Sequence, residues 1–282
     1  MTRRGLSAAA LLAPATLLVV ATLVAPLVLL FRFSLNRFVP GEFMVEALTA
    51  ENYVKFFTDP YYLAVLGTTL WVSLLVTLIC LVAGFPAAMF LARTRTRFKS
   101  LLILAVVLPL FVGNAVRAAG WMVAFGQKGV INAILGGLGL ISTPIEIMYT
   151  TTAVIIGIVA VNLPFVVLTL QSVLEGIDPA PEEAALSLGA RPFPTWWLVT
   201  LPQAVPGVLA AGVLCFILAM NAYATPVLLG GPSFQMMAPV VANEILQQSN
   251  WPFGGALSFV LMAVTLTLTA AANLIVARRY RV

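Results

Sequence analysis

One stretch of the chain decides its fold. Residues 147–174 read IMYTTTAVIIGIVAVNLPFVVLTLQSVL without a charged side chain, and residues 175–204 continue as EGIDPAPEEAALSLGARPFPTWWLVTLPQA. The first segment is long enough to cross a hydrocarbon core of about 30 Å as a helix, which takes about 20 apolar residues. The second segment is too short for a domain and too long for a simple turn. We therefore predict a membrane protein in which one loop has a specific task.

The composition of the whole chain also indicates a membrane protein. Its 282 residues are 61% hydrophobic and 9% charged, with a mean hydropathy of +1.05, whereas soluble domains carry about 25% charged residues. The chain contains no histidine, which excludes histidine-based nucleophiles and imidazole metal sites and argues against an enzyme. Cys80 and Cys215 lie in separate apolar runs, so we expect two buried thiols rather than a disulfide or a metal site.

Six apolar runs are long enough to span the bilayer. They cover residues 6–31, 64–92, 101–126, 147–174, 205–229 and 254–277. The first run is about twice as long as the apolar core of a secretory signal, so we expect it to remain as a helix. These runs predict an all-α membrane protein of six transmembrane helices. Residues 1–61 would form an N-terminal helix and a periplasmic loop, and residues 62–282 a five-helix core.

The basic residues predict the orientation. With both ends on one side, that side carries ten of the fifteen: Arg3, Arg4, Arg93, Arg95, Arg97, Lys99, Arg191, Arg278, Arg279 and Arg281. The other side carries Arg32, Arg37, Lys55, Arg117 and Lys128. Because loops rich in Lys and Arg stay inside the cell, both termini are predicted to be cytoplasmic. We interpret the cluster at residues 93–99 as a topology anchor against anionic lipid rather than a nucleic-acid site.

The loop at residues 175–204 is predicted to form a helix, a turn and a second helix. Asp178 suits the helix N-cap, and Glu182 and Glu183 complement the helix dipole in the first turn. Gly189 can end this helix in a left-handed conformation. A second short helix is expected over residues 194–201. The residues alone leave two roles open, amphipathic contact with lipid and docking of a protein.

A motif in this loop resembles a known family. Glu183-Ala184-Ala185 is followed at fixed spacing by Gly189, Val199 and Leu201-Pro202. This pattern resembles the cytoplasmic signature of permease subunits of binding-protein-dependent ABC importers. The resemblance implies a type I importer permease in the bacterial inner membrane, with a cytoplasmic coupling helix that contacts a separate ATPase subunit. The coupling residues that it implies are Glu183, Ala184, Ala185, Leu188, Gly189, Leu201 and Pro202.

Further segments resemble the first permease of spermidine/putrescine-type importers. They are Asn52-Tyr53, Asp59-Pro60, Lys128-Gly129 with Asn132, Thr143-Pro144-Ile145, Ala153 to Gly157, and Trp251-Pro252-Phe253-Gly254. This resemblance implies a polyamine such as putrescine or spermidine as solute. Permeases for opines, aminophosphonates and amino-acid-like solutes look similar and stay open as alternatives. An ion-coupled secondary carrier is less favoured, because no inverted repeat and no acidic residue at mid-membrane is evident.

The chain is not expected to bind a nucleotide or another cofactor. It has no Gly-x-x-x-x-Gly-Lys-Ser/Thr phosphate loop. The family resemblance implies several partner proteins. They are two ATPase subunits that use ATP and Mg²⁺, a second permease related by a pseudo-two-fold axis, and a periplasmic solute-binding protein. We expect contact with lipid and none with nucleic acid.

Polar residues in or near the spans are candidates for the solute pathway. They are Asn114, Asn162, Asn221 and Tyr223 within the spans and Glu146 and Glu244 at outer ends. Polar groups at membrane depth are costly in lipid and are expected to face protein or water. Hydrogen bonds between helices explain each of them at least as well. Arg117 is expected to pair with Glu146 or Glu244, or to reach the membrane interface.

Overall fold

The computed structural model describes residues 12–280, with side chains as far as residue 274. Five of its helices are long and apolar enough to cross a membrane: Leu12–Ser34, Pro60–Arg93, Thr151–Glu175, Pro192–Met220 and Trp251–Leu274. The two helices Lys99–Phe111 and Asn114–Gly137 are apolar enough only when taken together, and they make a sixth candidate span if the bent pair counts as one. The expected fold of transmembrane helices is therefore confirmed, with five or six candidate spans among the described residues. The described residues leave out the start of the first predicted span, together with Arg3, Arg4 and Arg281. They also leave out the side chains of Arg278 and Arg279.

One compact unit combines the chain up to Leu63 with Val240–Ala263. Its elements are η1 (Val20–Val24, a π-helical turn), α2 (Ala25–Ser34), β1 (Arg37–Val39), β2 (Phe43–Val45), α3 (Glu51–Thr58), the start of α4 (Pro60–Arg93), most of α13 (Met237–Leu246) and the first part of α14 (Trp251–Tyr280). The two strands form an antiparallel hairpin in which Arg37 pairs with Val45 and Val39 with Phe43.

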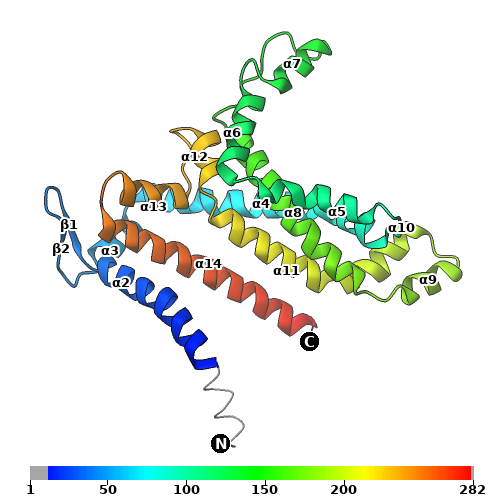
Figure 1. The fold of residues 1–282 in the computed structure, drawn as a ribbon, viewed down its shortest axis with the longest axis horizontal. Coiled ribbons are helices and arrows are strands. Elements are labelled where there is room, and N and C mark those ends of the chain that lie inside the picture. The colour runs from blue at the N-terminus through cyan, green and yellow to red at the C-terminus, as the bar shows by residue number, and fades with distance from the viewer. Residues whose placement is uncertain (1–11, 281–282) are drawn as a thin grey trace, which may run out of the picture. The chain divides into compact units, whose positions relative to one another are not determined.

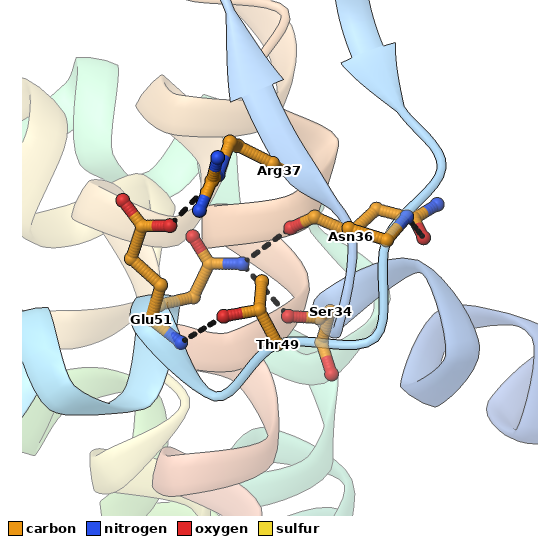
Figure 2. A network of polar contacts seen from close by, with 7 residues as sticks. Ser34, Asn36, Arg37, Thr49 and Glu51 are labelled. Atoms are coloured by element: carbon orange, nitrogen blue, oxygen red, sulfur yellow. Dashed lines mark hydrogen bonds and ion pairs between the residues drawn. The ribbon is translucent and has the colours of Figure 1, made fainter.

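A polar network joins α2 to α3 in this unit (Figure 2). The Asn52 side-chain amide donates to the carbonyl oxygens of Ser34 and Asn36, both at 2.8 Å. Asn52 is buried, so it satisfies backbone groups at the end of α2 that would otherwise lose hydrogen bonds. The Glu51 amide donates to Thr49 Oγ1 at 3.2 Å, and the Glu51 carboxylate pairs with Arg37 at 2.9 Å. The chain thus leaves α2 in a defined direction.

The other unit holds Ala64–Pro239 and the chain from Val264 onward. Besides most of α4, its elements are α5 (Lys99–Val107), η2 (Leu108–Phe111), α6 (Asn114–Phe125), α7 (Val130–Gly137), α8 (Thr151–Glu175), α9 (Ala180–Ser187), α10 (Pro192–Thr195), η3 (Trp196–Thr200), α11 (Leu201–Met220) and α12 (Ala224–Gly230).

The core of this second unit is built on close helix contacts. A Cβ added at Gly207 of α11 would lie 2.4 Å from Val173 of α8, so only glycine allows this approach. Cys80 and Cys215 are buried free thiols within the same core, as expected from the sequence. Water does not drive helices together inside a membrane, so their association depends on close packing. Small residues at the contact allow the two backbones to approach closely enough for it.

The third span, predicted over residues 101–126, is sharply bent in the structure. Its two parts, Lys99–Phe111 and Asn114–Gly137, are bent by 95°, and Figure 1 shows α6 leaving the direction of α5. Pro109, which lacks a backbone donor, lies just before the break, and the break itself consists of Val112 and Gly113, with ψ of 125° and 145°. Apolar length alone cannot reveal such a break, which is tolerated at membrane depth where the backbone faces protein or a cavity.

The fifth span also differs from the prediction of residues 205–229. It begins at Pro192 and ends at Met220, so the second surface helix expected over residues 194–201 is instead the first turns of the span. At the end of the helix the Ile217 carbonyl accepts both the Asn221 side-chain amide at 2.8 Å and the Asn221 backbone N–H at 3.3 Å. The short helix α12 follows after this break.

Candidate functional site

The helix predicted from the loop motif is α9. The Asp178 carboxylate accepts the Ala180 N–H at 3.0 Å, although the N-cap residue itself is Pro179. After the helix, Gly189 has φ +88°, and the Ala190 N–H donates to the Ala185 carbonyl at 3.1 Å. This arrangement is the glycine-terminated end predicted from the sequence.

One side of α9 is open to contact. Glu183, Ala184, Leu188 and Gly189 are exposed, and Leu188 retains 89% of its accessible surface. Ala185 and Leu201 are half-buried, while Pro202 is exposed at the start of α11. The motif residues therefore fall into two groups, a surface on α9 and the first turn of the following span.

Glu182 joins α9 to two transmembrane helices. Its Oε2 lies 2.6 Å from Arg93 Nη2 at the end of α4, and it accepts a hydrogen bond of 3.0 Å from the buried Thr200 hydroxyl. A second ion pair of 2.7 Å links Lys99 of α5 to Glu175 at the end of α8. The sequence interpretation missed both pairs because it treated residues 93–99 only as a topology anchor. The sequence did contain a signal for these pairs, because the loop at residues 93–99 is basic and the loop at residues 175–204 carries acidic residues.

A cavity of about 660 Å³ lies where two helices break. Its walls come from the bend between η2 and α6, from α8, and from the break between α11 and α12. Four of the predicted pathway residues line it together: Asn114, Asn162, Asn221 and Tyr223. The buried Asn162 amide also donates to the Cys215 carbonyl at 3.4 Å. Asn162 therefore both lines the cavity and bonds to a neighbouring helix.

The two predicted acidic residues lie outside this cavity. Glu146 accepts a hydrogen bond of 3.4 Å from Gln127, and Glu244 accepts one of 3.2 Å from Asn250. The expected pairing of Arg117 with Glu146 is wrong for the described residues. Arg117 instead donates to Asn114 Oδ1 and lines the cavity. Sequence reasoning could not place Arg117 there, because its position depends on the bend at the start of α6.

Several residues that carry the family resemblance have structural roles. The Asn132 amide donates to the Ile145 carbonyl at 3.0 Å and accepts the Ile145 N–H at 2.8 Å, closing the loop that follows α7. A Cβ at Gly157 would lie 2.5 Å from Thr225 of α12, and one at Gly254 would lie 2.4 Å from Ile245. These signatures therefore report how the helices pack rather than which solute is bound.

Comparison with known proteins gives consistent matches. Residues 47–282 match the family described as "Binding-protein-dependent transport system inner membrane component". The chain is 37% identical over 242 residues to the spermidine/putrescine transport system permease protein PotB of Haemophilus influenzae, covering 85% of this chain and 84% of that one. PotB of Escherichia coli K12 is 36% identical over 224 residues, covering 79% and 81%.

The fold also matches a solved transporter. A crystal structure of a bacterial alginate ABC transporter, in complex with an alginate pentasaccharide-bound periplasmic protein, contains a chain that aligns with a TM-score of 0.78. The alignment covers 98% of this chain and 96% of that chain at 18% sequence identity. At this identity the likeness concerns the arrangement of helices only.

Proposed function

Because the chain belongs to the family of binding-protein-dependent transport system inner membrane components, we propose that it carries a polyamine such as putrescine or spermidine through the membrane. As a member of this family it is a multi-pass inner-membrane permease of an ABC importer, a transport subunit without catalytic activity of its own. The observation that carries the polyamine assignment is the identity of 36–37% with PotB proteins over about four-fifths of each chain.

The importer has a binding protein and ATPase subunits as partners of this chain. In our proposal two ATPase subunits bind ATP and Mg²⁺, and a second permease of similar fold completes a pseudo-two-fold pair. Both termini and α9 face the cytoplasm, since ten of the fifteen Lys and Arg residues fall on that side. The solute-binding protein would deliver its solute from the periplasmic side.

The exposed side of α9 is the surface that we assign to the ATPase. Glu183, Ala184, Ala185 and Leu188 would enter a groove of that subunit, and Gly189 would turn the chain away from it. Leu201 and Pro202 would connect the contact to α11. Support comes from the exposure of Leu188, 89%, and from the attachment of α9 to the membrane helices through Glu182. A helix held at its inner side can transmit a push received at its outer side.

The cavity between the broken helices is the proposed solute pathway. Asn114, Asn162, Asn221 and Tyr223 supply amide groups and an aromatic face, and interrupted helices line binding sites in many transporters. An aromatic ring and amide oxygens can replace part of the hydration of an ammonium group. Glu146 and Glu244 would attract cations at the outer end without determining which solute passes.

Competition uptake tests the polyamine assignment. The complete importer is reconstituted in liposomes with its binding protein, and uptake of labelled putrescine is measured against spermidine, 4-aminobutyrate, an aminophosphonate and an opine. We expect the polyamines to compete best. If a zwitterionic or anionic solute competes best, the polyamine assignment is wrong while the importer assignment stands.

The division of labour between binding protein and permease is tested with Glu146→Gln and Glu244→Gln. Each substitution is expected to slow cation uptake by about two-fold, because it removes one attractive charge at a hydrated site. The order of preference among the solutes should not change. A changed order would locate part of the selectivity in this chain.

A further inference from the structure

Arg117 has an unusual environment for a charged residue. It lies in the first turns of α6, beside the break in the third span, and lines the cavity. Its Nη2 donates to Asn114 Oδ1. Its Nε and Nη1 are buried and have no hydrogen-bond partner among residues 12–280. A charged side chain within a membrane span is costly and by default indicates a functional site.

Nothing in the described cavity wall neutralises this charge. The residues that line the cavity, all from the unit of Ala64–Pro239, include neither Asp nor Glu. The side chain that contacts the guanidinium is Asn114, which is neutral, and the other polar side chains of the wall are neutral too. The N-terminus of α6 at Asn114 adds a partial positive charge of the same sign. The guanidinium keeps its proton under all physiological conditions, so the cavity is electropositive.

Such a cavity disfavours cations whenever it is poorly hydrated. Two like charges a few ångströms apart repel several times more strongly at an effective dielectric constant of about 20 than in bulk water. Hydration of the open pathway would weaken this repulsion. The same positive charge can therefore hold back cations in the closed state and let them pass in the open state. Arginine residues and half-helix dipoles supply comparable electrostatic barriers in selective pores.

We infer that Arg117 is a charge filter of the cavity, which prevents cations from leaking through the permease between transport cycles. The inference deepens the proposed function, since a polyamine importer faces inorganic cations of the same sign as its cargo. The filter acts through charge and not through bulk. Lysine at this position would preserve it, and a carboxylate beside it would cancel it.

Leak measurements without ATP and without binding protein test the inference. The complete importer is reconstituted in liposomes, and passive flux is measured for Rb⁺, chloride and the neutral solute erythritol. Arg117→Gln is expected to raise Rb⁺ flux by about tenfold, to lower chloride flux and to leave erythritol flux unchanged. Arg117→Lys should behave like the unmodified protein. Arg95→Gln, which removes an exposed charge outside the cavity, is the matched control.

A second variant tests the charge without removing the arginine. Asn114→Asp places a carboxylate where Arg117 already donates, and it should raise Rb⁺ flux as Arg117→Gln does. Unchanged Rb⁺ flux in both variants would overturn the inference. An equal rise for Rb⁺ and erythritol would overturn it too, because it would identify Arg117 as a steric plug. ATP-driven putrescine uptake by the unmodified complex, measured in parallel, tests the proposed function separately from these leaks.

Discussion

Arg93 Nη2 lies 2.6 Å from Glu182 Oε2, and this pair ties the last residue of α4 to the first turn of α9. Glu182 Oε2 also accepts the Thr200 hydroxyl, in the π-helical turn that leads into α11. One carboxylate thus connects the proposed ATPase contact to two membrane helices. A displacement of α9 reaches both helices through side chains that are already in contact.

Glu182→Gln is expected to weaken the coupling between ATP hydrolysis and transport. The substitution removes the charge that pairs with Arg93 while keeping an acceptor for Thr200. Because Glu182 and Arg93 are each about one-third exposed, the pair adds little to folding stability, on the order of 1 kcal/mol or less. Uptake per ATP hydrolysed by the reconstituted complex should fall by about two- to five-fold. Glu51→Gln breaks a more exposed pair far from α9 in sequence and serves as control; an equal ratio in both variants would contradict the link.

Gly189→Asp is expected to leave the protein in the membrane and abolish uptake. Its φ of +88° is unfavourable for a residue with a Cβ, and the new charge would lie on the proposed docking surface. A Cβ there meets nothing within 4 Å in the described chain, so folding should tolerate the change. Membrane levels by immunoblot and uptake in cells measure the two effects. Gly189→Asn, which adopts positive φ more readily, should keep most uptake; full uptake by the Asp variant would remove the docking role.

Gly157→Ala is expected to destabilise the packing of α8 against α12. The added Cβ would lie 2.5 Å from the Thr225 methyl group and 2.7 Å from Leu229 Cδ1, and overpacking of this kind costs about 1–3 kcal/mol. Thermal unfolding in detergent should therefore begin at a lower temperature. The control is Gly120→Ala in α6, where nothing lies within 4 Å of the new atom. Equal unfolding temperatures for the two variants would show that α8 and α12 are packed differently.

Cysteine labelling is expected to establish the orientation. The natural thiols Cys80 and Cys215 are buried, so their replacement by alanine gives a background for single cysteines. A membrane-impermeant maleimide should label Lys55→Cys and Lys128→Cys in intact cells. It should label Arg95→Cys and Arg191→Cys only after permeabilisation. Labelling of Arg191→Cys in intact cells would reverse the assignment of α9 to the cytoplasm.

The sequence by itself determined the class of protein, the apolar segments that form its candidate spans and the local shape of α9. Apolar length is sufficient for the spans because the bilayer imposes a minimum helix length on every crossing. The turn at Gly189 could be predicted because the ability of glycine to adopt positive φ is a property of that residue alone. The roles assigned to Glu183 and its neighbours in coupling, and to Asn114 and Tyr223 in transport, stay predictions.

Only the tertiary structure decided which distant residues meet. The bend before Asn114 and the stop at Asn221 bring polar residues of three helical segments to one cavity. Arg93 and Glu182, 89 residues apart, pair because the end of α4 lies beside the first turn of α9. Neither the shared cavity nor the ion pair follows from hydropathy, because an apolar run has the same hydropathy whether its helix is straight or broken. Contacts between helices depend on which faces pack together, and this is determined by how side chains fit throughout the unit.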